Sequence, residues 1–240
     1  MKNLVTYENL RRFAYSNDKL LTGPVKGMVV QFFGSGTLDV FENDPPEAKT
    51  YAQKGILHLI PYYNPWAWCT PNTRAFIEEL MDVLYAEYQL PADLPVVYTG
   101  SSMGGMTALA FSVLAKRKPV ACVPNCPVCD FFTYLDANPV NIRTVYSAWY
   151  GVEGSLEENM KSVSPLHLVD RLPNIKYCFF HGDCDDIVRK EKNVEPLVEA
   201  LRKKNYDVTY HIRPGVGHEL LTGEWKEMAI SYICSSILGK

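Results

Sequence analysis

Ser102 lies at the centre of a glycine-rich turn whose pattern is typical of a nucleophilic serine. The turn reads Gly100-Ser101-Ser102-Met103-Gly104-Gly105, which contains the pattern G-x-S-x-G. An apolar run over residues 95–99 precedes it, and a helix-like run over residues 106–116 follows it. A strand, a sharp turn and a helix in this order form a nucleophile elbow, which exposes the serine hydroxyl on a strained backbone. Such a hydroxyl attacks carbonyl carbon atoms when a base removes its proton.

A histidine and several carboxylates follow later apolar runs and could complete this chemistry. His218, directly after the last apolar run, is the candidate base. An imidazole base needs a carboxylate that fixes its tautomer and orientation. Asp183, Asp185 and Asp186 all follow the preceding apolar run, and their spacing does not choose among them. Asp130, which follows the run after the elbow helix, is a rival for the same role.

Short apolar runs alternate with helical patterns along most of the chain. We expect strands at residues 28–33, 55–61, 95–99, 120–124, 176–180 and 207–212. We expect helices at residues 72–88, 106–116, 190–204 and 225–238. This alternation predicts βαβ units with right-handed crossovers and a mostly parallel, doubly wound sheet. The expected fold class is an α/β three-layer α/β/α sandwich, which binds ligands where its strands end.

Two segments depart from the alternation. Residues 1–27 hold only short mixed segments, for which we expect an antiparallel hairpin at the sheet edge. Residues 130–172 are too long for a simple connection between neighbouring strands. We expect them to form a small helical insertion that acts as a lid or a pocket wall. A helix pair packed on the side of the domain is the alternative.

Aromatic residues gather directly after the second expected buried strand. Tyr63, Trp66 and Trp68 should lie at the same sheet edge as Ser102. Their rings could line a substrate pocket and stack on a sugar ring or a phenolic acyl group. Packing beneath the loop, away from any substrate, is an equally good interpretation.

The composition fits one globular domain over residues 1–240, with 47% hydrophobic and 21% charged residues. A net charge of −3, without a basic stripe or a long apolar segment, argues against nucleic-acid and membrane partners. Residues 1–9 lack the apolar stretch of a signal peptide, so we expect seven free cysteines in the cytoplasm. The single C-x-x-C, Cys126 to Cys129, has no second pair, and we expect no metal and no cofactor.

Several of these segments together resemble the α/β-hydrolase superfamily, and within it the esterase and prolyl-oligopeptidase-like (dienelactone-hydrolase-like) branch. The carrying residues are Gly100–Gly105, Ser164-Pro165 before Leu172-Pro173, His181-Gly182-x-x-Asp185-x-x-Val188, and Gly217-His218. The resemblance extends from about Met28 to Leu238. It implies Ser102 as nucleophile, Asp185 as acid and His218 as base, in the chain order Ser, Asp, His.

The same resemblance implies an oxyanion hole made of backbone N–H groups. Met103, directly after the nucleophile, supplies one N–H at the start of a helix. The second comes from Ser35 or Gly34, although this loop lacks the His-Gly-Gly pattern usual in the branch. Only 27 residues precede the first buried strand, so we expect no propeller domain of the large oligopeptidases.

These features predict a serine hydrolase that cleaves small-molecule carboxylic esters through an acyl-enzyme intermediate. Acylated carbohydrates and aryl esters are the expected substrates if the aromatic residues line the pocket. A small peptidase or amidase using the same three residues is the first alternative. A hydrolase fold without catalytic activity, which binds a ligand or partner, is the second. The sequence leaves the oligomeric state open.

Overall fold

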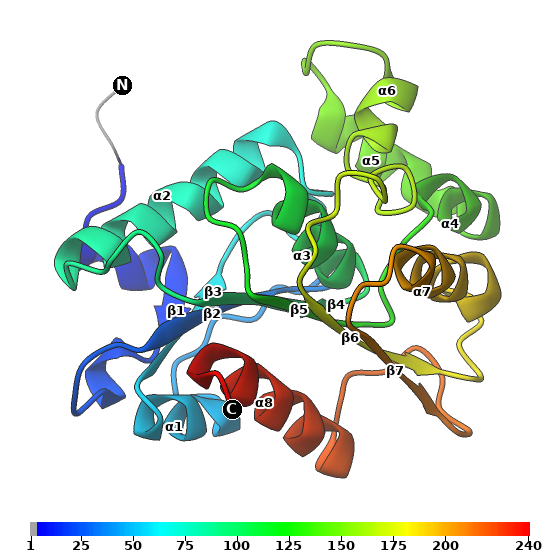
Figure 1. Ribbon diagram of the computed structural model, residues 1–240. Coiled ribbons are helices and arrows are strands. Elements are labelled where there is room, and N and C mark those ends of the chain that lie inside the picture. Colours follow the sequence, from blue (N-terminus) through cyan, green and yellow to red (C-terminus); the bar gives the residue numbers. More distant parts are fainter. Residues whose placement is uncertain (1–3) are drawn as a thin grey trace.

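The structure, a computed structural model, describes residues 4–240 and contains a seven-stranded sheet between layers of helices (Figure 1). The strands are β1 (Ala14–Ser16), β2 (Gly27–Phe32), β3 (Ile56–Pro61), β4 (Val96–Ser101), β5 (Ala121–Asn125), β6 (Lys176–Gly182) and β7 (Val208–Arg213). Their order across the sheet is β1-β3-β2-β4-β5-β6-β7. β1 runs antiparallel to β3, and all other neighbours are parallel.

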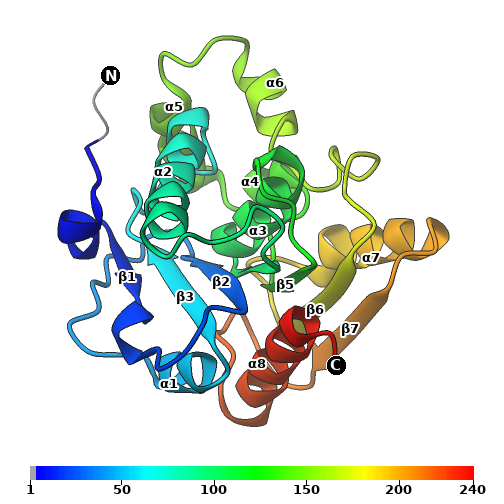
Figure 2. The same ribbon diagram turned by 60° about the vertical axis from the view of Figure 1, so that its left-hand side comes forward.

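Helices cover both faces of this sheet. The α-helices are α1 (Pro46–Gln53), α2 (Pro71–Glu87), α3 (Met103–Leu114), α4 (Phe131–Ala137), α5 (Ile142–Trp149), α6 (Leu156–Lys161), α7 (Val194–Lys203) and α8 (Gly223–Leu238). Short 3₁₀ helices are η1 (Tyr7–Arg12), η2 (Asp18–Leu20), η3 (Pro139–Asn141) and η4 (Lys190–Lys192). Figures 1 and 2 show α2, α3 and α7 on one face, and α1 and α8 on the other.

The strands supply apolar side chains to both layers, as buried parallel strands do. In β4, Val96 and Tyr98 belong to the core shared with α2 and α3. Val97, between them, points to the opposite core, where it joins Ile233 and Ile237 of α8. The sheet is therefore buried on both sides, and its functional groups can reach solvent only at the strand ends.

The predicted fold class is confirmed, with differences at the level of elements. The N-terminal segment contributes one antiparallel edge strand, β1, and not a hairpin, and residues 1–3 of it lie outside the described part. α1 was not expected from the sequence. α3 begins at Met103, three residues earlier than expected, so the helix starts directly after Ser102.

The segment over residues 130–172 contains α4, α5 and α6, which lie together beside the sheet (Figure 2). Hydrogen bonds attach it to the loops that follow β3 and β6. The Trp68 Nε1–H donates to Thr144 Oγ1 at 2.9 Å, and the Asn138 amide donates to the Ile187 carbonyl oxygen at 3.0 Å. The role of this segment as a lid stays a prediction. Within residues 4–240, no helix has the length and apolar character needed to cross a bilayer.

Candidate active site

Ser102 occupies a strained turn between β4 and α3. Its backbone has φ 57° and ψ −121°, a left-handed conformation that residues with a Cβ atom rarely adopt. The two flanking glycines permit the turn. A Cβ atom on Gly104 would lie 2.2 Å from the Phe32 carbonyl oxygen, and one on Gly100 would lie 2.6 Å from the backbone of Gly104. Strand, turn and helix thus approach closer than any other residue type would allow.

Backbone hydrogen bonds fix the elbow to the neighbouring strand. The Ser102 N–H donates to the Asn125 carbonyl oxygen at 3.0 Å, at the end of β5. The Ser102 carbonyl oxygen accepts from the Met106 N–H at 3.0 Å, which closes the first turn of α3. Because its main chain is held on both sides, Ser102 keeps its side chain at the carboxyl end of the sheet.

Asp185 and His218 are brought together at the same end of the sheet. The His218 Nδ1–H donates to Asp185 Oδ2 at 2.7 Å, because a carboxylate can only accept. The other oxygen, Oδ1, accepts from the Ile187 and Val188 N–H groups at 3.1 and 2.8 Å. This arrangement leaves His218 Nε2 with a free lone pair, which is the form of a general base.

A second histidine supports the buried carboxylate. His181 Nε2 lies 2.7 Å from the Val188 carbonyl oxygen and 3.3 Å from Asp185 Oδ2, so it must carry the proton. Burial alone would raise the pKa of Asp185. The hydrogen bonds from His181, His218 and the Val188 N–H outweigh burial and hold this pKa well below its usual range. Asp185 is therefore an anion in the folded protein.

The other three carboxylates considered from the sequence have different surroundings. Asp183 is exposed and accepts a hydrogen bond from the Gly215 N–H at 2.7 Å. Asp186 is exposed. Asp130 caps α4 by accepting from the Phe132 and Thr133 N–H groups at 3.0 and 3.3 Å. Of the four, Asp185 is the one that contacts His218.

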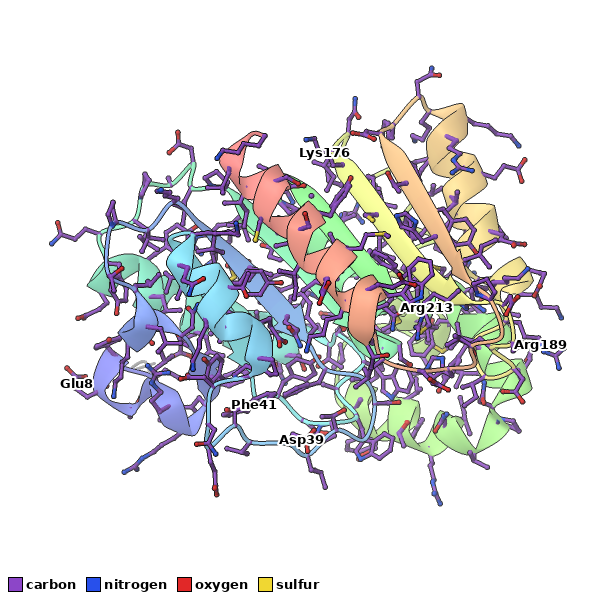
Figure 3. All side chains as sticks on the ribbon, turned by 90° about the horizontal axis from the view of Figure 1, so that it is seen from below. Glu8, Asp39, Phe41, Lys176, Arg189 and Arg213 are labelled. Carbon is purple, nitrogen blue, oxygen red and sulfur yellow. The ribbon has the colours of Figure 1, made fainter. Side chains whose placement is uncertain are left out.

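Two buried polar residues that the sequence analysis missed hold the loop after His218. Arg213, at the end of β7, is 2% exposed. Its guanidinium donates to the carbonyl oxygens of Glu219 and Leu220 at 3.0 and 3.2 Å and to Asn125 Oδ1 at 3.3 Å. Figure 3 shows Arg213 at the opposite end of the strands from Lys176. Arg213 and Asn125 belong to no recognisable sequence motif, so only their contacts in the structure reveal their role.

Asn125 also connects this loop to the elbow. Its Nδ2 donates to Ser101 Oγ at 3.1 Å and to the Glu219 carbonyl oxygen at 2.9 Å. The side-chain amide of Asn125 therefore contacts both the residue before Ser102 and the residue after His218. In residues 4–240, no hydrogen bond joins the Ser102 hydroxyl to His218. Such bonds are often long in unliganded hydrolases and tighten when substrate binds.

The expected oxyanion donors lie around the elbow. A Cβ atom built on Gly34 would lie 3.7 Å from Ser102 Cβ, so the loop after β2 approaches Ser102 closely. Ser35 follows in the same loop, which is attached by the Gly36 N–H to the Pro65 carbonyl oxygen at 3.0 Å. Met103 is the first residue of α3, and the first N–H groups of a helix have no acceptor inside it.

The three aromatic residues expected near the pocket lie in different surroundings. Tyr63 is buried, and its hydroxyl donates to the Phe33 carbonyl oxygen at 2.8 Å, next to Gly34. Trp68 is fully buried and packs against Phe131 in a tilted arrangement, with ring centroids 4.9 Å apart. Trp66 is 42% exposed and is the one of the three that a ligand can reach directly.

A cavity of about 360 Å³ opens behind the elbow, between α1 and α8. It is lined by residues adjacent to the expected catalytic groups: Gly34, Ser101, Leu220 and Leu221. Asp39 and Phe41, from the loop after β2, form part of its wall (Figure 3). None of the three aromatic residues described above lines it. Much of its wall is apolar, as in most small-molecule sites.

Solved structures that share this fold include esterases and peptidases. Esterase PE8 is 16% identical, with a TM-score of 0.61, over 88% of this chain and 93% of that one. A puromycin-hydrolyzing peptidase of Mycobacterium tuberculosis is 17% identical, with a TM-score of 0.70, over 90% of this chain and 35% of that one. An acylaminoacyl peptidase of Pyrococcus horikoshii is 13% identical, with a TM-score of 0.67, over 88% and 36%. The chain spans about a third of the length of these two peptidases.

The sequence itself points to a family. No functionally curated protein matches it. The prolyl oligopeptidase family model, however, matches residues 78–233, which include the elbow, Asp185 and His218 and make up more than half of the chain. The chain therefore belongs to the prolyl oligopeptidase family of serine hydrolases.

Proposed function

We propose that this serine hydrolase cleaves carboxylic esters, with Ser102 as nucleophile, His218 as base and Asp185 as the acid. The observation that carries the proposal is the 2.7 Å hydrogen bond from His218 Nδ1 to the buried Asp185 carboxylate. It sets the imidazole tautomer that a base requires, beside a serine whose backbone has the geometry of an elbow.

The reaction proceeds through an acyl-enzyme. His218 Nε2 removes the Ser102 proton while Oγ attacks the ester carbonyl carbon, and the proton then passes to the leaving alcohol. The N–H of Met103 and one from Gly34 or Ser35 hold the tetrahedral oxyanion, and one such donor typically contributes about 3–4 kcal/mol. Water, deprotonated by the same imidazole, then releases the carboxylic acid.

The chemistry of the leaving group favours an ester over a peptide substrate. An amide needs firmer protonation of its leaving group than an ester does, and within residues 4–240 we identify no group dedicated to that task. We propose that the cavity behind Gly34 receives one side of the ester, and that Trp66 stacks on an aryl or sugar group on the other. Peptidase activity is the alternative, favoured by the family membership.

Substituting the nucleophile tests the assignment. Ser102→Ala should lower kcat for p-nitrophenyl acetate by at least about 10³-fold and leave the circular dichroism spectrum unchanged, because only the nucleophilic oxygen is lost. Ser101→Ala is the matched control and should lose far less. Wild-type protein should react with a fluorophosphonate probe and prefer the ester to an aminoacyl nitroanilide. Full activity in Ser102→Ala refutes the nucleophile. An unreactive wild type favours the non-catalytic alternative.

The cysteines support a reducing compartment. All seven are free, and six of them are buried. We propose that the protein is cytoplasmic, since disulfides are rare in that compartment. We also propose that it acts on small molecules without nucleic-acid or membrane partners.

A further inference from the structure

Cys126 places a thiol beside the Asp185–His218 pair, where the proposed reaction does not use it. Its Sγ, one Asp185 oxygen and one His218 ring nitrogen all lie within 4.8 Å of one another. Cys126 directly follows β5 and adopts a left-handed backbone with φ 36°. Its N–H donates to the Phe180 carbonyl oxygen at 2.8 Å, which fixes the residue between β5 and β6.

These three groups are a ligand set for a particular kind of metal ion. Zinc prefers sulfur, imidazole nitrogen and carboxylate oxygen, and binds them in a tetrahedron with water in an open position. Magnesium and calcium prefer oxygen alone. We propose that Cys126, Asp185 and His218 form an inhibitory zinc site, which rests on the function proposed above for its effect on activity.

The required movements are small. Ligand atoms around tetrahedral zinc lie roughly 3.3–3.6 Å apart, given bond lengths of about 2.0–2.3 Å. His218 Nδ1 and Asp185 Oδ2 are now 2.7 Å apart and would have to separate by about half an ångström. The sulfur, at no more than 4.8 Å, would have to approach by at most about 1.5 Å. The side chain of His218 is 18% exposed, whereas the Asp185 side chain and Cys126 are buried, so the His218 side of the three-residue site is the one open to solvent.

Coordination through either ring nitrogen removes the base. If Nε2 binds the ion, its lone pair is no longer free to accept the serine proton. If Nδ1 binds, the imidazole proton must move to Nε2, which leaves the wrong tautomer. In both cases the thiol proton passes to solvent, and the thiolate and carboxylate balance the charge of the ion. The ion is therefore an inhibitor, distinct from a cofactor.

Two cysteine variants separate this site from unspecific binding. Cys126→Ala removes the proposed ligand. Cys184→Ala removes the exposed thiol beside Asp185 and is the matched control. Each protein is treated with a chelator and titrated with zinc chloride while esterase activity is followed. Wild type and Cys184→Ala should lose activity together, and chelator should restore it. Cys126→Ala should need at least about tenfold more zinc, since the loss of even an outer-shell partner typically lowers metal affinity by that factor.

Cobalt chloride provides a readout that does not depend on catalysis. Cobalt bound to wild type and to Cys184→Ala should give a thiolate-to-metal charge-transfer band, which Cys126→Ala should lack. If Cys126→Ala fails to fold, Cys126→Ser takes its place. Equal zinc sensitivity in wild type and Cys126→Ala, or a band that disappears in Cys184→Ala, overturns the proposal. A protein without esterase activity that still gives the Cys126-dependent band refutes the proposed function and retains the metal site.

Discussion

At the scale of the residue, burial and hydrogen bonding distinguish Asp185 from its neighbours. Three aspartates lie within the stretch Asp183–Asp186, yet only Asp185 is buried. Its two oxygens accept from different partners, His218 on one and the Ile187 and Val188 N–H groups on the other. The same contacts that favour it as the proposed acid also stabilise the turn in which it stands.

We expect Asp185→Asn to lower kcat by about 10⁴-fold. The amide NH₂ would face His218 Nδ1, which would leave the proton on Nε2 and remove the base. Oδ1 could still accept from the Ile187 and Val188 N–H groups, so thermal melting should confirm a folded protein. Asp186→Asn, at an exposed position in the same loop, is the control and should keep near wild-type kcat. A similar loss in both variants would show that the acid is wrongly assigned.

At the scale of the element, the loop that carries His218 is held by a strand end. Arg213 and Asn125 come from β7 and β5, and together they bind the carbonyl oxygens of Glu219 and Leu220. The buried Arg213 guanidinium donates hydrogen bonds to several acceptors, and each acceptor would lose a hydrogen bond if the guanidinium were removed. The position of the candidate base thus depends on residues that lie outside every motif.

Arg213→Met should destabilise the protein by roughly 2–4 kcal/mol, because the fully buried guanidinium and its three hydrogen bonds, to the Glu219 and Leu220 carbonyl oxygens and to Asn125 Oδ1, are lost. We also expect kcat to fall more than KM changes, since the loop that carries His218 loosens. Urea unfolding and steady-state kinetics measure the two effects. Arg189→Met, at an exposed arginine, is the comparison and should change both by little. Unchanged stability in Arg213→Met would contradict the role given to this guanidinium.

The sequence predicts the repeating elements well and the local exceptions poorly. Apolar runs placed β2 to β7 and α2 close to their observed bounds, because buried parallel strands are apolar on both faces. α1 was missed because its sequence, Pro46-Glu47-Ala48-Lys49-Thr50-Tyr51-Ala52-Gln53, has few apolar residues to mark a buried face. β1 is only three residues long, too short to carry a pattern.

The candidate site shows the same limit. G-x-S-x-G and the resemblance gave Ser102, Asp185 and His218, since motifs preserve local spacing. Asn125 and Arg213 meet across 88 positions of the chain, and no local pattern encodes such a contact. The ranking of Tyr63, Trp66 and Trp68 by exposure likewise depends on how distant loops pack around them.

At the scale of the whole molecule, the sheet buries a titratable group far from solvent. His58, in the middle of β3, is fully buried and lies against the rings of Tyr15 and Tyr51. Its Nε2 pairs with Gln31 Oε1 at 3.1 Å. Burial lowers the pKa of His58 to about 4, so the folded protein keeps this imidazole neutral where the unfolded chain would protonate it.

Global stability should consequently fall on mild acidification. Below pH 6.5 the unfolded chain takes up a proton at His58 that the folded protein does not accept until about pH 4. Between pH 7 and pH 5 this difference removes about 2 kcal/mol of unfolding free energy. Urea titrations of wild type and His58→Gln at both pH values measure it, and the decrease should be smaller in the variant. Identical pH dependence would show that other groups cause the loss.

The backbone conformation at Ser102 implies a trade-off between the stability of the fold and the proposed catalysis. A turn with φ 57° and ψ −121° suits a residue without a side chain, and any other residue held there raises the free energy of the fold by about 1–3 kcal/mol. Selection for heat resistance alone would thus favour glycine at this position, at the loss of the reactive oxygen. Under the proposed mechanism, serine at this position lowers the stability of the fold in exchange for catalysis, a trade-off common at active sites.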